Sequence, residues 1–385
     1  MRLSACLIVK NEGARLARAV ESVRGVADEV VITDTGSTDD TRELARSLGC
    51  RVFHHEWADD FAAARNACLA HARGEWVLWL DGDERLKPGS DKDVQVAITD
   101  PGVIAWQVIR EDFFHEDRPD WFSEMMQMRL VRRSLPCRFV GRIHEHLVPA
   151  PVEIAPALRK SVRVSAIRLQ HWGYTRERLP EKLARGAALC ELELRERPGQ
   201  LYYLVELARS YVSLNDPRAG AVLGKAAAIM LARRSDPAPP TPMASALIEQ
   251  LLALPGQAFA SEDDLLALAA RWFPRSVPLL WAAARVRSAR GEFPAAESLL
   301  RTLIGLLDRG DGDRYTSFDP RVGEDARFNL AVCLVRRAEL KEARDLFTAL
   351  LASPRRSDAA RQNLAAISDV EAKFGDGGSG ETRNG

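Results

Sequence analysis

The chain has 385 residues, more than one hydrophobic core usually organises, so we expect two domains. Lys plus Arg and Asp plus Glu number 54 each, which gives a formal net charge of zero. This balance provides no strongly basic surface, so neither nucleic acid nor an anionic membrane is expected as a partner.

The sequence also argues against a secreted or membrane-spanning protein. Its first apolar stretch is too short for a signal peptide and is followed at once by Lys10 and Glu12. No uninterrupted apolar run approaches the roughly 20 residues that cross a bilayer. The six cysteines include no C-x-x-C pair, which argues against a zinc ribbon and a disulfide framework. We therefore expect a cytoplasmic protein without a transmembrane segment, whose thiols are reduced and mostly buried.

Short apolar runs alternate with amphipathic stretches from residue 3 to about residue 110. The runs LSACLIV (3–9), EVVITD (29–34) and WVLWLD (76–81) predict strands, with helices such as 14–25 and 61–74 between them. This alternation is typical of an α/β domain with a doubly wound, mostly parallel sheet and helices on both faces.

The stretch after the second run has signals for both ends of a helix. Ser37, Thr38 and Asp39 are residue types that cap a helix N-terminus, and Gly49 suits the left-handed conformation that ends one. We expect a helix between these two signals.

The pattern changes between about 103 and 175, where a few strands and loops complete a first domain that we place at residues 1–175. From about residue 176 the chain is rich in Ala, Leu and Arg and has a helical period. We therefore expect an all-α second domain over 176–372. The tail 373–385 is Gly-rich and polar, which predicts disorder.

Two segments of the helical part, 279–304 and 327–351, have the spacing of small and apolar residues found in tetratricopeptide hairpins. Gly291 lies where the turn of the first hairpin is expected. A fainter copy covers 201–226. An ordinary helical domain without repeats is the alternative.

Polar residues follow three of the predicted strands, as KNE (10–12), DTGSTDD (34–40) and DGDE (81–84). Ligands of a doubly wound sheet bind beyond the carboxyl ends of its strands. Burying an ionised carboxylate costs several kcal/mol unless it is paired or binds a metal. Each motif alone also fits an ordinary turn, but three on one edge favour a ligand site. An acidic edge without compensation also argues against an inactive protein.

Five blocks of sequence, taken together, resemble the family 2 glycosyltransferases of GT-A fold. More narrowly, they are similar to a bacterial subgroup with C-terminal tetratricopeptide repeats that includes peptide S-glycosyltransferases. The resemblance covers roughly residues 1–175. The blocks are SACLIVKNEGARLARAVESV, DEVVITDTGSTDDT, HEWADDFAAARNACLAHARGEWVLWLDGDE, RFVGRIHEHL and HWGY.

The resemblance implies a nucleotide-sugar site built on the ends of the first strands. Val9, Asn11 and Glu12 match the loop that lines the nucleotide base and ribose. Asp34 resembles the carboxylate that accepts hydrogen bonds from the uracil or ribose. Arg65 resembles the family's arginine near the nucleotide, where a guanidinium complements diphosphate charge. A surface arginine on a helix is the alternative for Arg65.

The resemblance also implies a divalent metal ion, Mn²⁺ or Mg²⁺. Asp81 and Asp83 match the D-x-D motif, with Asp81 nearer the ribose and Asp83 on the metal. Such an ion bridges the diphosphate and neutralises the charge that develops as it leaves. His171 is a candidate for an additional metal ligand, and a buried, hydrogen-bonded histidine is the alternative.

Inverting transfer requires a base that takes a proton from the acceptor. Glu145 in RIHEHL is the first candidate, and Asp112 is the competing carboxylate. A structural ion pair of Glu145 with Arg142 or Arg129 is an alternative to a catalytic role.

The sequence therefore predicts an inverting, metal-dependent glycosyltransferase with a nucleotide-sugar donor, most simply a UDP-sugar. Concave repeat surfaces suit extended peptides, which favours a peptide or protein acceptor. A saccharide or lipid-linked acceptor, typical of surface glycan synthesis, and an inactive repeat scaffold are the alternatives. A nucleotidylyltransferase is not favoured, because VKNEGARL lacks the Gly-rich, Arg-containing loop of that class. The helical repeats are also candidates for homo-oligomer formation.

Overall fold

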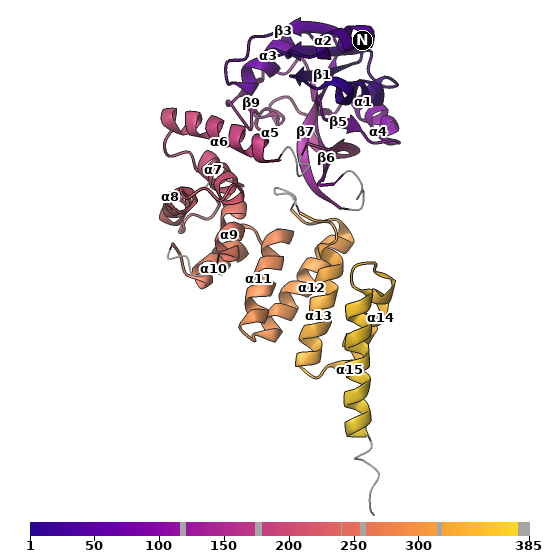
Figure 1. Cartoon of the computed structure of the whole chain (residues 1–385), viewed down its shortest axis with the longest axis vertical. Helices are drawn as coiled ribbons and strands as arrows, with labels where there is room; N and C mark the ends of the chain where they lie inside the picture. Colours follow the sequence, from indigo (N-terminus) through magenta and orange to yellow (C-terminus); the bar gives the residue numbers. More distant parts are fainter. Residues whose placement is uncertain (116–120, 174–178, 240, 255–258, 314–317, 376–385) are drawn as a thin grey trace, which may run out of the picture. The chain divides into compact units, whose positions relative to one another are not determined.

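The computed structural model describes residues 1–115, 121–173, 179–239, 241–254, 259–313 and 318–375. The chain forms two compact units, Met1–Leu231 and Ala232–Gly385. The first unit contains the sheet and the helices that follow it directly, and the described part of the second unit is helical (Figure 1). The proposed domain boundary near residue 175 lies outside the described residues.

The first unit begins with alternating strands and helices, as expected. These elements are β1 (Leu3–Val9), α1 (Gly13–Val23), β2 (Glu29–Asp34), α2 (Thr41–Ser47), β3 (Arg51–His54), α3 (Phe61–His71), β4 (Trp76–Asp81), β5 (Glu84–Leu86) and α4 (Ser90–Ala97). The later elements are β6 (Val103–Phe113), β7 (Phe122–Arg132), β8 (Arg138–Val140), β9 (His146–Val148), α5 (Pro151–Ile154), β10 (Ser161–His171), α6 (Leu179–Glu196), α7 (Leu201–Ser213) and α8 (Ala219–Ala232).

Eight of these strands form one mixed sheet in the order β3-β2-β1-β4-β7-β6-β10-β5. The first four run parallel, β7 runs antiparallel to both neighbours, and β10 is parallel to β6. In the register, Val9 lies beside Asp34, and Ile8 lies beside Asp81. The strands β1, β2 and β4 therefore end at one edge of the sheet, as predicted.

Helices cover both faces of the sheet, because its central strands are apolar on both sides. Successive side chains of β1 point to opposite faces. Leu7 packs with residues of α1, α2 and α4, whereas Cys6 packs with α3 and with the hairpin of β8 and β9. Both residues are fully buried. The predicted doubly wound α/β fold is confirmed.

The start of α2 differs from the prediction. The cap residue is Asp40, whose side chain makes no capping hydrogen bond, and Ser37 instead accepts a hydrogen bond from the N–H of Asn11. The expected capping by Ser37 and Thr38 is therefore wrong, because these residues join the β1 and β2 loops. Asp39, the third predicted capping residue, accepts a hydrogen bond from the N–H of Thr41, the first residue of α2, at 3.1 Å. The end of the helix is as predicted, with Gly49 in the left-handed conformation at φ 81°.

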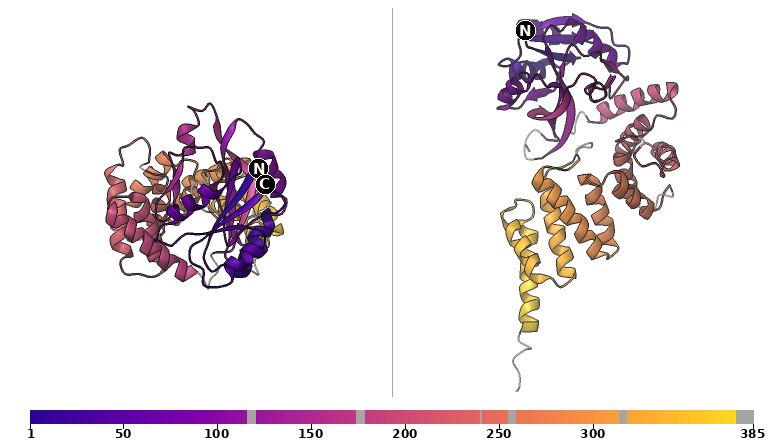
Figure 2. Two further views of the ribbon diagram at one scale, coloured as in Figure 1. Left: turned by 90° about the horizontal axis from the view of Figure 1, so that it is seen from above. Right: turned by 180° about the vertical axis from the view of Figure 1, so that it is seen from behind.

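Helices of the second unit pack side by side as hairpins (Figure 2). Gly291, with φ 76°, joins the helices of the first predicted hairpin, and Ala296 and Leu303 are buried between them. Phe347 is buried in the second hairpin. The helices are α9 (Ala244–Ala253), α10 (Glu262–Trp272), α11 (Val277–Ala289), α12 (Phe293–Arg309), α13 (Val322–Arg336), α14 (Leu340–Ala349) and α15 (Ser357–Gly375), with a 3-10 turn η1 (Leu350–Ala352).

The fainter predicted repeat corresponds to α7 and α8, which belong to the first unit. The helix α15 extends to Gly375, three residues into the segment expected to be disordered. The remainder of that tail, 376–385, lies outside the described residues.

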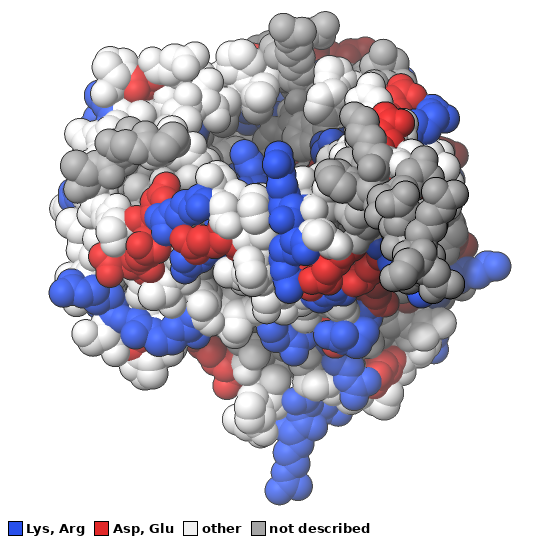
Figure 3. Space-filling view, turned by 90° about the horizontal axis from the view of Figure 1, so that it is seen from below, with Lys and Arg blue, Asp and Glu red and all other residues white. Residues whose placement is uncertain are grey.

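The face drawn in Figure 3 shows Lys and Arg side chains interspersed with Asp and Glu side chains. Within the described ranges, no helix combines the length and apolar character that a membrane crossing requires. The six cysteines are free thiols, and all except Cys137 are buried.

Candidate active site

Backbone and hydroxyl groups join the loops that follow β1 and β2. Asn11 adopts φ 55°, a left-handed conformation that asparagine tolerates better than most residues. Its side-chain oxygen accepts a hydrogen bond from the N–H of Thr38 at 2.8 Å. The hydroxyl of Thr41 accepts from the N–H of Glu12 at 2.9 Å. The predicted nucleotide loop is therefore attached to the loop after β2.

Asp34 ends β2 and is fully buried. Its carboxylate accepts hydrogen bonds from the backbone N–H groups of Gly36 and Ser37 at 3.2 and 3.1 Å. Burial of a carboxylate is tolerable when such donors replace water. In this structure Asp34 shapes the loop, and its contact with a nucleotide remains a prediction.

The end of β1 also meets the D-x-D segment. A Cβ atom at Gly82 would lie 2.6 Å from the Cγ of Glu12, so only glycine lets the side chain of Glu12 approach this backbone so closely. The carboxyl ends of β1, β2 and β4 are therefore in direct contact with one another. The predicted residues at these ends are Val9, Asn11, Glu12, Asp34 and Asp81.

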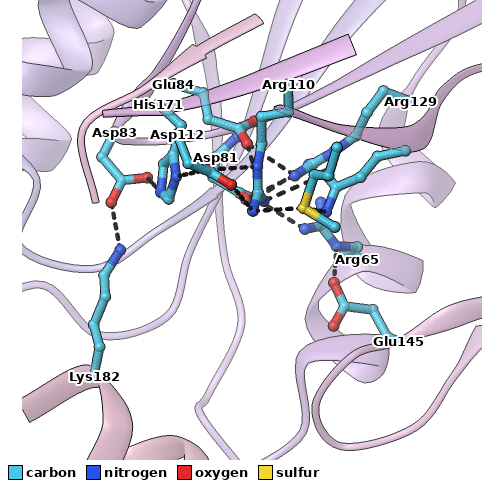
Figure 4. A network of polar contacts seen from close by, with 12 residues as sticks. Arg65, Asp81, Asp83, Glu84, Arg110, Asp112, Arg129, Glu145, His171 and Lys182 are labelled. Atoms are coloured by element: carbon cyan, nitrogen blue, oxygen red, sulfur yellow. Dashed lines mark hydrogen bonds and ion pairs between the residues drawn. The ribbon is translucent and has the colours of Figure 1, made fainter. Parts of the chain in front are cut away.

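Asp81 lies at the end of β4, and its side chain is 31% exposed. Two arginines donate to its carboxylate, Arg65 at 2.8 Å and Arg129 at 3.0 Å (Figure 4). Burial alone would raise the pKa of Asp81, but the positive charges of Arg129 and Arg65 outweigh it and hold this pKa well below its usual range. Asp81 is therefore ionised and held in place.

Arg65 projects from α3 and is 7% exposed, so the alternative of a surface arginine is wrong. Its Nε donates to Glu145, while its Nη2 donates to Asp81. The guanidinium also lies 5.2 Å from the ring of Trp79. Burial would lower the pKa of Arg65, but the charges of Glu145 and Asp81 raise it above its usual value. Glu145 thus pairs with Arg65, rather than with Arg142 or Arg129 as considered above.

Glu84 connects the D-x-D segment to β6 and β7. Its carboxylate lies 2.9 Å from the guanidinium of Arg129 and 3.7 Å from that of Arg110, and it accepts the N–H of Asp81 at 2.9 Å. Burial raises the pKa of Glu84 despite these arginines. Arg110 then reaches Asp112 at 2.8 Å.

Asp112 and His171 form a buried pair at the ends of β6 and β10. The Nδ1 of His171 lies 2.6 Å from Asp112, and its Nε2 lies 3.4 Å from the Oδ1 of Asp83. Burial would lower the pKa of His171, but its hydrogen bonds with Asp112 and Asp83 raise it. Asp112 therefore orients the ring, and the imidazole faces Asp83.

Asp83 completes this part of the site. Its Oδ2 lies 2.7 Å from the Nζ of Lys182 on α6, and its side chain is 6% exposed. Burial would raise the pKa of Asp83, but the hydrogen bond with His171 and the charges of His171 and Lys182 lower it. Among the ten residues labelled in Figure 4, five carboxylates face three arginines, one lysine and one histidine.

The expectation of an uncompensated acidic edge is therefore wrong. Arginines and Lys182 balance the carboxylates without a metal, so the acidic residues alone do not argue against an inactive protein. This compensation comes mainly from β6, β7 and α6, which lie far from the D-x-D motif in the sequence.

Gly173 packs directly against the ends of three side chains. A Cβ atom there would lie 2.1 Å from the Nε2 of His171, 2.2 Å from the Nζ of Lys182 and 2.6 Å from the Oδ2 of Asp83, so this position has no room for a side chain. The donor types of Asp83 and His171 are ones that divalent metal ions use in proteins. Across the described ranges, no group of three His, Cys, Asp or Glu side chains could hold a metal. The residues fit an ion that takes its remaining ligands from a bound diphosphate or water.

The structure thus brings together Arg65, Asp81 and Glu145 on one side, and Asp83, Asp112 and His171 on the other (Figure 4). Sequence reasoning missed Lys182, because it lies in no recognisable metal or nucleotide motif, and it assigned no role to Gly173 of the HWGY block. Arg110 and Arg129 had only a weak signal, since each is one of several polar or charged residues within its strand.

The fold and the site define an α/β protein whose acidic cluster lies at the carboxyl ends of its strands. Residues 4–153 match the family model "Glycosyl transferase family 2". This segment of the chain is therefore similar to the family 2 glycosyltransferases.

Two curated relatives are similar to part of the chain. TPR repeat-containing protein Synpcc7942_0270 of Synechococcus elongatus is 32% identical over 223 residues, which cover 57% of this chain and 54% of the relative. Glycosyltransferase SunS of Bacillus phage SPbeta is 24% identical over 196 residues, which cover 50% and 45%. The chain spans about half the length of each. The crystal structure of S. aureus TarS 1-349 in complex with UDP-GlcNAc has a TM-score of 0.37 and 15% identity, covering 70% of this chain and 91% of that one.

Proposed function

We propose that the protein is an inverting glycosyltransferase that moves a sugar from a nucleotide diphosphate, most simply a UDP-sugar, to a peptide or protein acceptor with the help of Mn²⁺ or Mg²⁺. The observation that carries this proposal is the arrangement of Asp83 and His171, in which the Nε2 of His171 lies 3.4 Å from Asp83 and Asp112 holds the ring. The similarity to family 2 glycosyltransferases supports the reaction class.

Asp83 and His171 would hold the metal. Both side chains are nearly fully buried, and Asp112 fixes the ring so that Nε2 points toward Asp83. A carboxylate that orients a ligating histidine in this way is common in protein metal sites. When bound, the ion would stabilise the negative charge of the departing diphosphate. This arrangement supports a positioning role for Asp112 rather than that of the base.

The loops after β1 and β2 would hold the nucleoside. Their backbone is fixed by the hydrogen bonds among Asn11, Thr38 and Thr41, so a nucleotide would meet a site that is already formed. Such preorganisation reduces the entropy lost on binding. Arg65 stands beside Asp81, where its charge would also favour the diphosphate.

Glu145 remains the candidate base. In Figure 4 it lies on the far side of the cluster from Asp83, as a base on the acceptor side requires. In the proposed step, the acceptor oxygen or sulfur bonds to the anomeric carbon while the bond from that carbon to the diphosphate breaks. The electron pair of that bond leaves with the nucleoside diphosphate, and the acceptor proton passes to Glu145.

The packed helical hairpins of the second unit support a peptide or protein acceptor. Stacked helical repeats generally provide an extended surface that suits such chains. The same surface also suits a second copy of the protein.

The test is a thermal melt with UDP or GDP, each with Mn²⁺ or with EDTA. A ligand that binds only the folded state at 100 times its Kd stabilises it by about 2.7 kcal/mol, which raises the midpoint by several degrees. We expect this shift with UDP and Mn²⁺, and its loss in EDTA and in Asp83→Asn.

Gly173→Ala provides a second variant, because the added methyl group would overlap the side chains of His171, Lys182 and Asp83 and so displace them. Gly25→Ala is its matched control, since a Cβ there meets no atom within 4 Å. A shift in the control but not in Gly173→Ala supports the proposed site. No shift under any condition would favour an inactive scaffold. A shift with GDP alone would mean that the donor is a GDP-sugar rather than a UDP-sugar.

A further inference from the structure

Lys182 reaches the site from outside the segment that matches the family model. It lies in the first turns of α6, whereas the match ends at residue 153. Its Nζ donates to the Oδ2 of Asp83 at 2.7 Å, and the two side chains are 24% and 6% exposed. A buried carboxylate requires such a partner, because an uncompensated charge in the interior costs several kcal/mol.

The ammonium group of Lys182 and the imidazole of His171 contact the same carboxylate. The Nζ of Lys182 lies 2.7 Å from the Oδ2 of Asp83, and the Nε2 of His171 lies 3.4 Å from its Oδ1. An ammonium group donates three hydrogen bonds and has no lone pair with which to ligate a metal. A divalent ion bound to Asp83 would be repelled by Lys182, so the two cations exclude one another.

We propose that Lys182 is the counter-ion of Asp83 in the metal-free protein and that a divalent metal must displace it. This inference rests on the metal site of the proposed function. Lys182 therefore weakens metal binding when no nucleotide is present. The displaced ammonium group is a suitable partner for the diphosphate of a bound donor, which offers it negative charge in place of Asp83. Lys182 thus couples metal binding to nucleotide binding.

The competition is measured by titrating the full-length protein with Mn²⁺ alone and following free Mn²⁺ by electron paramagnetic resonance. Lys182→Met removes the competing charge, so it should bind Mn²⁺ about tenfold more tightly than the wild type, within the usual range of coupling between sites. Lys182→Gln should do the same while it keeps a hydrogen-bond donor for Asp83, which protects the fold. Lys182→Arg keeps the charge and should remain close to the wild type.

Lys87→Met is the matched control. Lys87 lies 2.8 Å from the buried carboxylate of Glu111 in the same unit, so its removal also breaks a lysine–carboxylate pair. Its Mn²⁺ affinity should equal that of the wild type. The titration is repeated with UDP, which should tighten Mn²⁺ binding more in the wild type than in Lys182→Gln.

The results separate this inference from the proposed function. Tighter Mn²⁺ binding in both uncharged variants, but not in Lys87→Met, supports the competition. Equal Mn²⁺ affinity in the wild type and the uncharged variants overturns the competition and leaves the metal site intact. No Mn²⁺ binding by any variant, with or without UDP, overturns the metal site itself.

Discussion

The Nη2 of Arg65 donates to the Oδ1 of Asp81 at 2.8 Å, and this contact connects α3 to the end of β4. The helix and the strand are thus held together at the edge where the site lies. Because Arg65 also donates to Glu145, one buried side chain fixes a carboxylate of the D-x-D motif and the candidate base.

Arg65→Lys should destabilise the first unit and reduce transfer. An ammonium group cannot reproduce the planar fork that reaches two carboxylates, so at least one would lose its partner. We expect the free energy of unfolding to fall by about 1–3 kcal/mol, measured by urea denaturation. The control is Arg24→Lys, since Arg24 pairs with Glu21 on the surface of α1. Equal losses of unfolding free energy in both variants would show that the contacts of Arg65 stabilise the fold no more than a surface ion pair does.

Asp112→Asn should weaken metal binding while the metal ligands themselves are unchanged. The amide cannot hold the His171 ring as the carboxylate does at 2.6 Å, so Nε2 would no longer be fixed toward Asp83. We expect a roughly 10–100-fold lower Mn²⁺ affinity, measured by calorimetry in the presence of UDP. Glu21→Gln, on an exposed side chain, is the control. Unchanged Mn²⁺ affinity combined with abolished turnover would instead favour Asp112 as the base.

The strands of the first half could be predicted from the sequence, because each is a short apolar run between polar turns. The predicted limits of β1, β2 and β4 match the structure, since a strand buried on both faces needs apolar residues throughout. The antiparallel direction of β7 was not predictable in this way, because an apolar pattern has the same period in either direction.

The residues of the candidate site also differ in whether a local sequence signal predicts them. Asp34, Asp81 and Asp83 were found because they follow buried strands, which is a local signal. Lys182 was missed because it contacts Asp83 across 99 residues and lies in an ordinary helical pattern. The acidic cluster therefore looked uncompensated in the sequence, although distant basic side chains balance it.

Glu29 lies at the start of β2, away from the proposed metal ligands. Its environment leads us to expect that the stability of the first unit depends on pH. Burial would raise the pKa of Glu29, but hydrogen bonds from Ser4, Arg73 and Arg51 outweigh it and lower the pKa below the ordinary value of 4.5. The folded state therefore holds the ionised form more strongly than the unfolded state does. This stabilisation is present above the unfolded pKa and is lost as the pH falls through the folded pKa.

The check is to measure the free energy of unfolding of Glu29→Gln and of the wild type between about pH 7 and about pH 3.5. The wild type should be more stable at neutral pH, and the difference should shrink in acid. Glu43→Gln, whose side chain is 67% exposed, should show little difference at any pH. A difference between wild type and Glu29→Gln that stays constant with pH would contradict the ionic role of Glu29.

Phe347→Ala should destabilise the second unit without removing nucleotide binding. Phe347 is fully buried and lies 5.5 Å from the ring of Phe328, so its removal should cost about 3–5 kcal/mol. The ten residues labelled in Figure 4 belong to the first unit, which has its own core. Calorimetry should therefore show a lower transition for the second unit, while UDP and Mn²⁺ still stabilise the first. Lys341→Ala, on the exposed side of α14, should change neither transition. Loss of the UDP-dependent shift in Phe347→Ala would mean that the donor site needs the folded second unit.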